Sequence, residues 1–556
     1  MTLRLRTQLR NGGVALPLAA LLACLVLAPL VVLGWLALQA GTAHWSHLVT
    51  HVLPQAAINT ALLLTGVGVL TALLGTGTAW LVTAYDFPGR RILTWALLLP
   101  LAVPTYIVAY AYLDLLHPIG PVQTALRTLL GYDNPRQLRL PDLRTLQGAV
   151  FVLGFVLYPY VYLTTRVMFM SQAASLLEAA RTLGATRIET FWRVVLPMAR
   201  PAIAVGLSLS LLETLNDIGA SEFLGVQTLT VAVYTTWVTR SDLGGAAQIA
   251  LAMLVIVIGL ILLERHGRQR QRFSGTQRMR PVQATRLHGA KAALALVLGA
   301  LPVIIGFAAP AAYLVTETFK RLHIVGGVSA QLLSALLNTL VLATAATALT
   351  LFCGLVVAWA ARSPRLGAGS GNAGNFDLPR ACVRIAGLGY AVPGTVLAIG
   401  LLTPLLIIDG AWGFVTGNSG LFLMGSTAAL VIAYGIRFLA ISSGGIEAGL
   451  TRIPPSLEQA SRLLGETATG TLRRVHLPLL RPALAASALL VFVDAMKELP
   501  VTLLLRPMNF DTLATWLYAD AARGSYEEGA VAALAIVAAG LLPVILLARV
   551  NLKMGR

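Results

Sequence analysis

The segment Glu178-Ala-Ala-Arg-Thr-Leu-Gly184 returns 281 residues later in the chain as Gln459-Ala-Ser-Arg-Leu-Leu-Gly465. Each copy is followed at the same spacing by a Leu-Pro and an Arg-Pro pair: Leu196-Pro197 and Arg200-Pro201, then Leu477-Pro478 and Arg481-Pro482. Self-similarity at a fixed distance is the signature of an internal repeat. The chain of 556 residues is therefore predicted to consist of two related halves.

The repeated segment predicts two short helices joined by a sharp turn. Residues 172–183 contain no helix breaker and carry apolar side chains on one helical face. Gly184 permits a left-handed turn, and a second short helix is expected over 186–195, ended by the prolines that follow. The second copy repeats this pattern around Gly465.

Composition indicates that lipid surrounds most of the chain. Hydrophobic residues make up 57% and charged residues 12%, whereas soluble domains carry roughly 25% charged residues. A bilayer core needs about 20 apolar helical residues. Twelve such runs lie near 14–38, 57–84, 92–113, 147–170, 201–220, 245–263, 290–316, 333–360, 383–408, 421–447, 482–505 and 529–549. We expect an all-α integral membrane protein with about twelve transmembrane helices.

Six predicted spans fall in each half, so each half returns to the side on which it began. The halves are therefore expected to be parallel repeats. We place the first half at 1–263, a basic cytoplasmic linker at 264–291 and the second half at 292–556. The linker is expected to anchor the topology near anionic lipid.

The distribution of basic residues predicts the orientation. Of the 41 Lys and Arg residues, 29 lie in the termini and loops of one side and nine on the other. The positive-inside rule places both termini in the cytoplasm of a multi-pass protein of the bacterial inner membrane. The net charge of +18 thus reflects topology, and no basic segment interleaved with aromatic residues points to nucleic acid.

The paired loops resemble the EAA loop of type I ATP-binding-cassette importer permeases, which docks into the ATPase subunit. The second copy departs from the pattern, since Gln459 stands where the acid belongs and Glu458 precedes it. Contact from Glu458 would need a rotation of about 100° around the helix. The resemblance implies two docking loops, with Glu178, Ala179, Ala180, Gly184, Leu196 and Pro197 in the first and Glu458, Gln459, Ala460, Gly465, Leu477 and Pro478 in the second.

The chain contains no motor of its own. Its four lysines are Lys291, Lys320, Lys497 and Lys553, and none follows glycine, which excludes a GxxxxGK[ST] phosphate loop. We therefore expect a translocation subunit without catalytic residues or a bound cofactor, and two separate ATPase subunits that use the ATP. The competing class is a secondary transporter driven by an ion gradient, which needs no docking loops.

Three stretches resemble the ferric-iron permease family: Glu213-Thr-Leu-Asn-Asp-Ile-Gly-Ala, Lys497-Glu-Leu-Pro-Val-Thr-Leu-Leu-Leu-Arg-Pro and Asn509-Phe-Asp-Thr-Leu-Ala-Thr. That resemblance implies Fe(III) as the substrate and a periplasmic binding protein that delivers it. Permeases for thiamine, phosphonate, polyamine or another small solute remain alternatives, because some of them share the fused architecture.

Two acids recur in the span after each loop, Glu213 and Asp217 in the first half and Asp494 and Glu498 in the second. A spacing of four places each pair on one helix face. Charges within a membrane usually face a cavity or a partner, and Fe(III) favours oxygen ligands. Two interpretations stay open: a ring of four carboxylates that lines a cation path, or structural pairing, for instance with Lys497, and helix capping.

No metal site is assigned from the sequence. His44, His47 and His51 have helical spacing and form either a metal-collecting patch or an interfacial turn. Tyr158, Tyr160 and Tyr162 either contact substrate or pack beside a proline kink.

Overall fold

The computed structural model describes most of the chain, and nearly all of that part is helical. The described residues are 15–40, 45–132, 134, 136–171, 180, 182–269, 284–362, 378–417, 420–524 and 526–554. Within these ranges, the only sheet is a short parallel pairing of β1 (Tyr85–Asp86) with β2 (Thr285–Arg286), which joins the end of the predicted linker to the first half.

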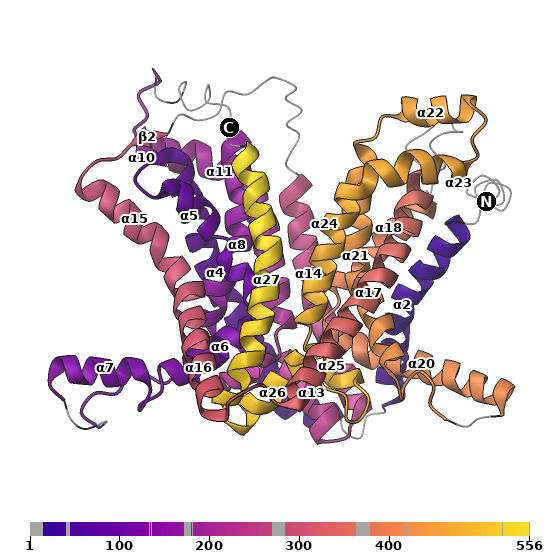
Figure 1. Ribbon diagram of the computed structural model, residues 1–556, viewed down its shortest axis with the longest axis horizontal. Coiled ribbons are helices and arrows are strands. Elements are labelled where there is room, and N and C mark those ends of the chain that lie inside the picture. Colours follow the sequence, from indigo (N-terminus) through magenta and orange to yellow (C-terminus); the bar gives the residue numbers. More distant parts are fainter. Residues whose placement is uncertain are drawn as a thin grey trace. The chain divides into compact units, whose positions relative to one another are not determined.

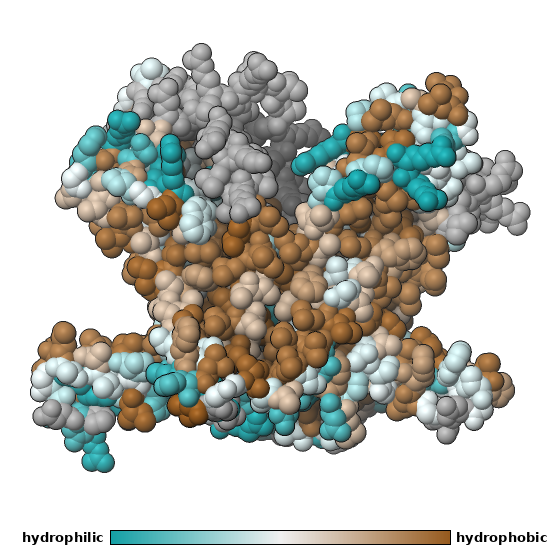
Figure 2. Space-filling view, viewed as in Figure 1, coloured by the Kyte–Doolittle hydropathy of each residue, from teal (hydrophilic) through white to brown (hydrophobic). Residues whose placement is uncertain are grey.

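Eleven helices of the described residues are long and apolar enough to cross a membrane, and a bent pair brings the number to twelve. This confirms the predicted all-α membrane fold. In a helix the backbone N–H and C=O groups bond to each other, so they need no partner from the surrounding hydrocarbon. Side chains that face outward are apolar along these helices, such as Leu21, Val31 and Trp35 of α2 (Ala15–Gln39). The space-filling view shows such apolar surface, with hydrophilic residues gathered near α22 and α23 (Figure 2).

The third predicted span, 92–113, is not one straight helix. It consists of α5 (Arg90–Ala96), the 3₁₀ turn η2 (Leu99–Ala102) and α6 (Thr105–Leu115), bent by 92°. Pro104 causes the break. It begins α6 in a non-helical conformation (φ −57°, ψ 142°), and the residue before it is extended.

The second half contains the same break at the same local sequence. Ala102-Val103-Pro104 recurs as Ala391-Val392-Pro393, and Pro393 adopts φ −56° and ψ 142° before α20 (Gly394–Thr416). The short helices α18 (Leu378–Ala386) and α19 (Leu388–Ala391) precede the break. The membrane helix of this region therefore runs from 394 to 416 rather than over the predicted 383–408.

The chain forms two compact units, each built from segments of both sequence halves. Unit 1 comprises 1–42, 236–251 and 329–515, and unit 2 comprises 43–235, 252–328 and 516–556. The predicted boundaries at 263 and 292 divide the sequence into its two copies. The compact units follow a different division, because each contains segments from both sides of these boundaries.

Unit 1 is built around three packed helices, α17 (Ala330–Arg362), α21 (Thr427–Thr451) and α24 (Leu477–Met496). The first helix of the chain, α2, packs against α17, α18 and α20 (Figure 1). The unit also contains α22 (Pro455–Leu463), α23 (Ala468–Thr471), the π-helical turn η7 (Leu472–His476) and α25 (Pro500–Leu505).

Unit 2 has the equivalent core of α4 (Leu53–Ala84), α8 (Leu146–Ser171) and α11 (Leu196–Asn216). Helices from the second half pack on it: α15 (Ala290–Val303) against α4 and α5, and α16 (Ala309–Val325) against α6 and α27 (Tyr526–Met554). The remaining elements are α3 (Trp45–His47), η1 (Leu48–Val52), α7 (Pro121–Leu130), α10 (Arg187–Thr190), η3 (Phe191–Val195), α12 (Gly219–Phe223), α13 (Leu229–Tyr234), η5 (Ile304–Ala308) and most of α26 (Leu513–Arg523). The turn η4 (Thr235–Thr239) and α14 (Leu243–Gln269) each have residues in both units.

Candidate functional site

The second repeated loop forms a helix–turn–helix in unit 1. After α22, Gly465 reverses the chain with φ +87°, a left-handed conformation that residues with a side chain rarely adopt. Thr467 then caps α23, and its hydroxyl accepts a hydrogen bond from the Gly470 amide at 3.1 Å. The predicted left-handed turn at Gly465 is confirmed.

The first loop makes the same turn in unit 2. Gly184 has φ +84°, and the Ala185 amide donates a hydrogen bond to the Ala180 carbonyl at 3.1 Å. The left-handed turn expected at Gly184 is thus confirmed as well. Two predicted docking residues of this loop, Glu178 and Ala179, lie outside the described residues.

A reciprocal capping box begins the second helix of the first loop. The Thr186 amide donates to Glu189 Oε2 at 2.9 Å, and the Glu189 amide donates to Thr186 Oγ1 at 3.3 Å. This arrangement satisfies amides that the first turn of α10 leaves without helical partners. It fixes the direction in which the chain leaves the turn.

Both loops continue into membrane helices without a break, which corrects the expectation that the prolines end the second short helix. The π-helical turn η3 joins α10 to α11, and η7 joins α23 to α24. Pro197 and Pro478 are the second residues of α11 and α24, directly after the π-helical turns, and the helical course continues through them. The second short helix of each loop is therefore continuous with a membrane helix. We call these two continuous stretches, residues 187–216 and 468–496, the helical levers.

Large apolar side chains are exposed around both turns. Leu183 is 88% exposed in the first loop, and its repeat equivalent Leu464 is 85% exposed in the second. Ile188, Trp192 and Leu463 add to these surfaces with 73%, 61% and 89% exposure. Exposed apolar side chains near a polar loop are typical of surfaces that a partner protein covers. Gln459 and Ala460 are also exposed, on α22.

Glu458 does not face outward, which corrects its predicted place on the docking surface. Its side chain is 1% exposed and forms a buried salt bridge with Arg362 at the end of α17. His476 Nε2 lies 2.9 Å from Glu458 Oε1. The rotation needed to expose Glu458 is blocked because Arg362 and His476 hold the carboxylate inside.

Arg362 also anchors the loop through backbone contacts. Its guanidinium donates to the Ile453 carbonyl at 2.7 Å and to the Leu450 carbonyl, both near the end of α21. We call the cluster of Arg362, Glu458 and His476 the ionic joint. The sequence did not predict it. The available signal was an arginine at the end of an apolar run, placed 96 residues before the acid.

The acids of the predicted carboxylate ring do not share helix faces as expected. α11 ends at Asn216, so Asp217 leaves the helix with φ −79° and ψ 109°. Its carboxylate accepts a hydrogen bond from the Ala220 amide at 2.8 Å and another from the Thr105 hydroxyl. Asp217 is thus a cap for α12 and a contact to α6.

The second pair has charged partners. Lys497 Nζ lies 2.8 Å from Asp494, and Arg437 Nε donates to the buried Glu498 at 3.0 Å. Because α24 ends at Met496, Glu498 also lies beyond its helix. Glu213 and Asp217 belong to unit 2 and the other two acids to unit 1, so the ring stays a prediction.

Two of the three tyrosines of α8 belong to the core of unit 2, whereas Tyr160 is half-buried. Tyr158 and Tyr162 are fully buried, and the Tyr162 hydroxyl donates to the Thr94 carbonyl at 2.8 Å. Of the histidines, His44 lies outside the described residues, and His51 is within hydrogen-bonding distance of Thr50 at 2.6 Å. Histidine, cysteine and acidic side chains of the described residues form no group of three or more that could hold a metal.

Comparison with known proteins identifies the family of this arrangement. The model of the binding-protein-dependent transport system inner membrane component matches residues 68–273 and again residues 365–554. The two matches together cover more than half of the chain and confirm that it is a duplicated protein. Each match contains one of the two helical levers.

Three curated relatives span different parts of the chain. The Fe(3+)-transport system permease protein FbpB 2 of Haemophilus influenzae is 25% identical over 89% of this chain and 90% of its own length. The sulfate transport system permease protein CysT of Salmonella typhimurium is 28% identical over 46% of this chain. A putative 2-aminoethylphosphonate transport system permease protein, PhnU of Salmonella paratyphi A, is 31% identical over 35%. The chain belongs to the family of binding-protein-dependent transport system inner membrane components, as a permease subunit with two fused copies of the family domain.

Proposed function

We propose that this protein is the permease of an ATP-binding-cassette importer for ferric iron. The observation that carries the proposal is the extent of the match to the Fe(3+)-transport permease, which covers both halves in one chain. The sulfate and phosphonate permeases match at most about half of the chain. A relative with the same fused architecture shares more of the surfaces that contact partners and substrate.

The exposed apolar turns support docking of two ATPase subunits, one on each loop. Leu183 and Leu464 occupy equivalent positions beside the left-handed glycines, so one type of ATPase groove can accept both. The basic loops on the same side support a cytoplasmic location for these surfaces and for both termini. A periplasmic protein then delivers the substrate on the opposite side.

The helical continuity of the loops supports their role as levers. Because α10, η3 and α11 follow each other without interruption, displacement of the turn moves the membrane helix as well. α23, η7 and α24 repeat this connection. Closure of the two ATPases on ATP pulls both levers and changes the side to which the path is open, as alternating access requires.

Reconstitution tests the function directly. The permease is assembled in liposomes with its ATPase, and the binding protein is added on the outside with radioactive ferric iron. We expect uptake that requires ATP and the binding protein. Sulfate, 2-aminoethylphosphonate and thiamine serve as competing substrates in parallel assays. Uptake of one of these without uptake of iron would overturn the substrate assignment.

The same preparation tests the mode of energy use. A stable complex of the permease with an ATPase supports the importer. Uptake by the permease alone, driven by a proton or sodium gradient, would show that it is a secondary transporter.

A further inference from the structure

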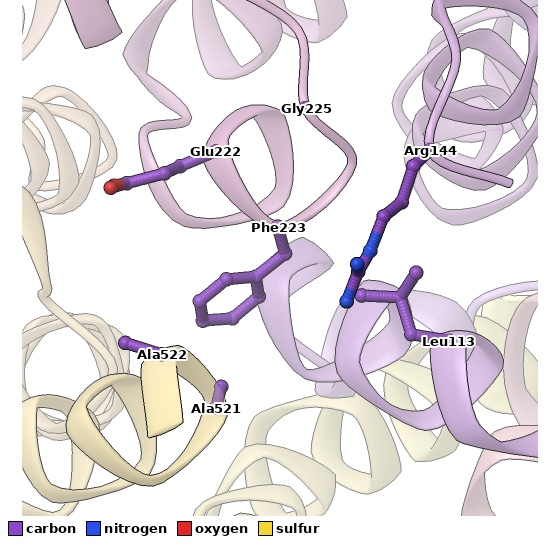
Figure 3. Close-up of a pocket in the computed structure, with 7 residues that line it drawn as sticks. All are labelled: Leu113, Arg144, Glu222, Phe223, Gly225, Ala521 and Ala522. Carbon is purple, nitrogen blue, oxygen red and sulfur yellow. The ribbon is translucent and has the colours of Figure 1, made fainter. Parts of the chain in front are cut away.

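Unit 2 contains a partly enclosed cavity of about 370 Å³ at the end of α11 that is remote from its docking loop. With a rise of about 1.5 Å per residue, α11 separates the two by roughly the thickness of a bilayer core. The walls come from α6, α12, α26 and the segment before α8. Figure 3 shows Arg144 and Glu222 on opposite sides of Phe223, with the Glu222 side chain extending away from Arg144.

A short hydrogen bond joins α12 to α26 beside this cavity. The Tyr518 hydroxyl of α26 donates to Glu222 Oε2 at 2.5 Å, although the residues are 296 positions apart in the sequence. Tyr518 is 8% exposed, and Phe223 stacks on its ring with centroids 5.6 Å apart. Tyr234 meets the same ring edge-on at 6.5 Å.

These contacts place one carboxylate and two phenols together. A hydrogen bond between Tyr234 and Tyr518 helps to raise the pKa of Tyr518, as do burial and the bond to Glu222. Burial also raises the pKa of Glu222, and the hydrogen bond from Tyr518 partly offsets this. Glu222 and Tyr518 are thus hydrogen-bonded to each other in a poorly solvated place.

The spacing of the oxygens suits a small, hard cation. Two neighbouring oxygen ligands of an octahedral ion with bonds of about 2.0 Å lie about 2.8 Å apart. The Glu222 and Tyr518 oxygens lie within hydrogen-bonding distance, so an ion can replace the hydroxyl proton with little movement of either side chain. Carboxylate and phenolate oxygens are hard ligands, which trivalent iron prefers over nitrogen and sulfur.

We propose that Glu222, Tyr518 and Tyr234 form an outer binding site for ferric iron within the permease. This inference rests on the proposed iron transport and deepens it by naming a site in the chain itself. Iron stays Fe(III) throughout: Fe–O bonds form to the carboxylate and the phenolates, and each phenol releases its proton to water. No oxidant or reductant is needed.

Arg144 defines the form in which the iron enters. Its side chain lines the same cavity, and a guanidinium disfavours a bare trivalent cation. A chelate with carboxylate groups removes this repulsion, because a carboxylate that does not bind the iron can pair with the guanidinium. Ferric citrate is therefore the probe for this site.

Absorption spectroscopy tests the site without transport. Titration of the full-length protein in lipid nanodiscs with ferric citrate is expected to produce a visible band from tyrosinate-to-Fe(III) charge transfer. Tyr518→Phe and Glu222→Gln are each expected to weaken iron binding about tenfold or more, and Tyr518→Phe also to reduce the band. The exposed Tyr132 provides the matched control, since Tyr132→Phe leaves affinity and band unchanged.

Folding is monitored in the same samples. Tyr518→Phe keeps the ring that stacks on Phe223, and Glu222→Gln keeps a hydrogen-bond acceptor, so thermal midpoints near that of the wild type are expected. Gallium(III), which gives no charge-transfer band, is expected to compete with iron for the site. Absence of the band in the wild type, or equal affinities in wild type and variants, would show that the bond between Glu222 and Tyr518 is only structural.

The uptake assay separates this inference from the proposed function. Ferric uptake that stays normal in Tyr518→Phe, together with absence of the band, overturns the site and leaves the iron permease standing. A wild-type transporter that carries another substrate and no iron overturns both.

Discussion

From the left-handed glycine onward, the two loops proposed to dock ATPases have the same helical form, but they are held by different chemistry. In the first loop, Trp80 of α4 contacts Phe191 of η3 with ring centroids 5.2 Å apart and Phe169 of α8 at 5.4 Å. Val195 is fully buried beside them in the same core. An aromatic and aliphatic cluster thus attaches this loop to unit 2.

The second loop keeps the tryptophan and replaces its surroundings. Trp359 is the repeat equivalent of Trp80, but Leu450 and Leu472 stand where the first copy has Phe169 and Phe191. His476 takes the place of Val195, and Trp359, Arg362, Glu458 and His476 line one small pocket. The loop is held by the ionic joint.

The difference shows that both copies kept the continuous helix after the turn, whereas the side chains that hold each loop to its unit differ. Apolar contacts resist a displaced loop gradually, because dispersion energy is spread over many atoms. A buried ion pair tolerates little displacement, because a separated charge in a dry site is costly. We therefore expect the two loops to respond differently when their attachments are altered.

Removal of the arginine of the ionic joint has the largest expected effect. Arg362→Ala leaves the Glu458 carboxylate buried without its cation, and such losses cost about 3–5 kcal/mol. Thermal unfolding of the solubilised protein and co-purification of the ATPase measure the loss. The double variant Arg362→Met with Glu458→Met is expected to recover most of the stability, since both charges are absent. A single variant as stable as the wild type would contradict the ionic joint.

The aromatic attachment is expected to be slightly less sensitive. Trp80→Ala removes contacts with Phe169 and Phe191 and costs about 3 kcal/mol. Trp359→Ala, in the second copy, is the matched variant and is expected to lower the thermal midpoint less. Equal shifts in the two variants would mean that the aromatic cluster does not distinguish the loops.

A smaller structural effect is expected at the turn itself. Gly465→Val forces a branched side chain into a left-handed conformation, at a cost of about 1–2 kcal/mol. ATP hydrolysis is expected to continue while transport falls, because the lever leaves its fixed direction. No atom lies within 4 Å of an added Cβ at Gly465 or at Gly410 in α20, so Gly410→Val controls for the added bulk. Normal coupling in Gly465→Val would argue against a rigid turn.

The exposed leucines are expected to affect stability least. Leu464→Ser and Leu183→Ser change the free energy of unfolding by at most about 0.5 kcal/mol, as for other surface positions. Each is nevertheless expected to weaken ATPase binding, measured by co-purification. Leu129→Ser, 83% exposed in α7, is the control and leaves binding intact. Unchanged binding in both loop variants would exclude this surface as the docking site.

Local signals explain what was predictable from the sequence. Apolar runs indicated the membrane helices, and Gly184 and Gly465 indicated the turns, because each depends only on neighbouring residues. The break before α6 also had a local signal, the Val-Pro pair at 103 and 104, which recurs at 392 and 393. The structure shows that this pair interrupts the helix, because Pro104 and Pro393 precede α6 and α20 with nearly the same backbone angles.

Contacts between distant residues explain what was not predictable. Arg362 and Glu458 are 96 positions apart, and Glu222 and Tyr518 are 296 apart. Periodicity places each residue on a face of its helix but does not tell which other helix that face meets. The end of α11 before Asp217 was missed for a related reason, since helix boundaries depend on packing as well as on spacing.

The packing of α2 has a consequence for synthesis. This helix is synthesised well before its neighbours α17, α18 and α20, which lie within residues 330–416. α2 therefore stays in the bilayer without these neighbours until residues 330–416 have been translated. A chain cut within the linker would yield two fragments that each lack helices for their own unit, and neither is expected to fold without the other.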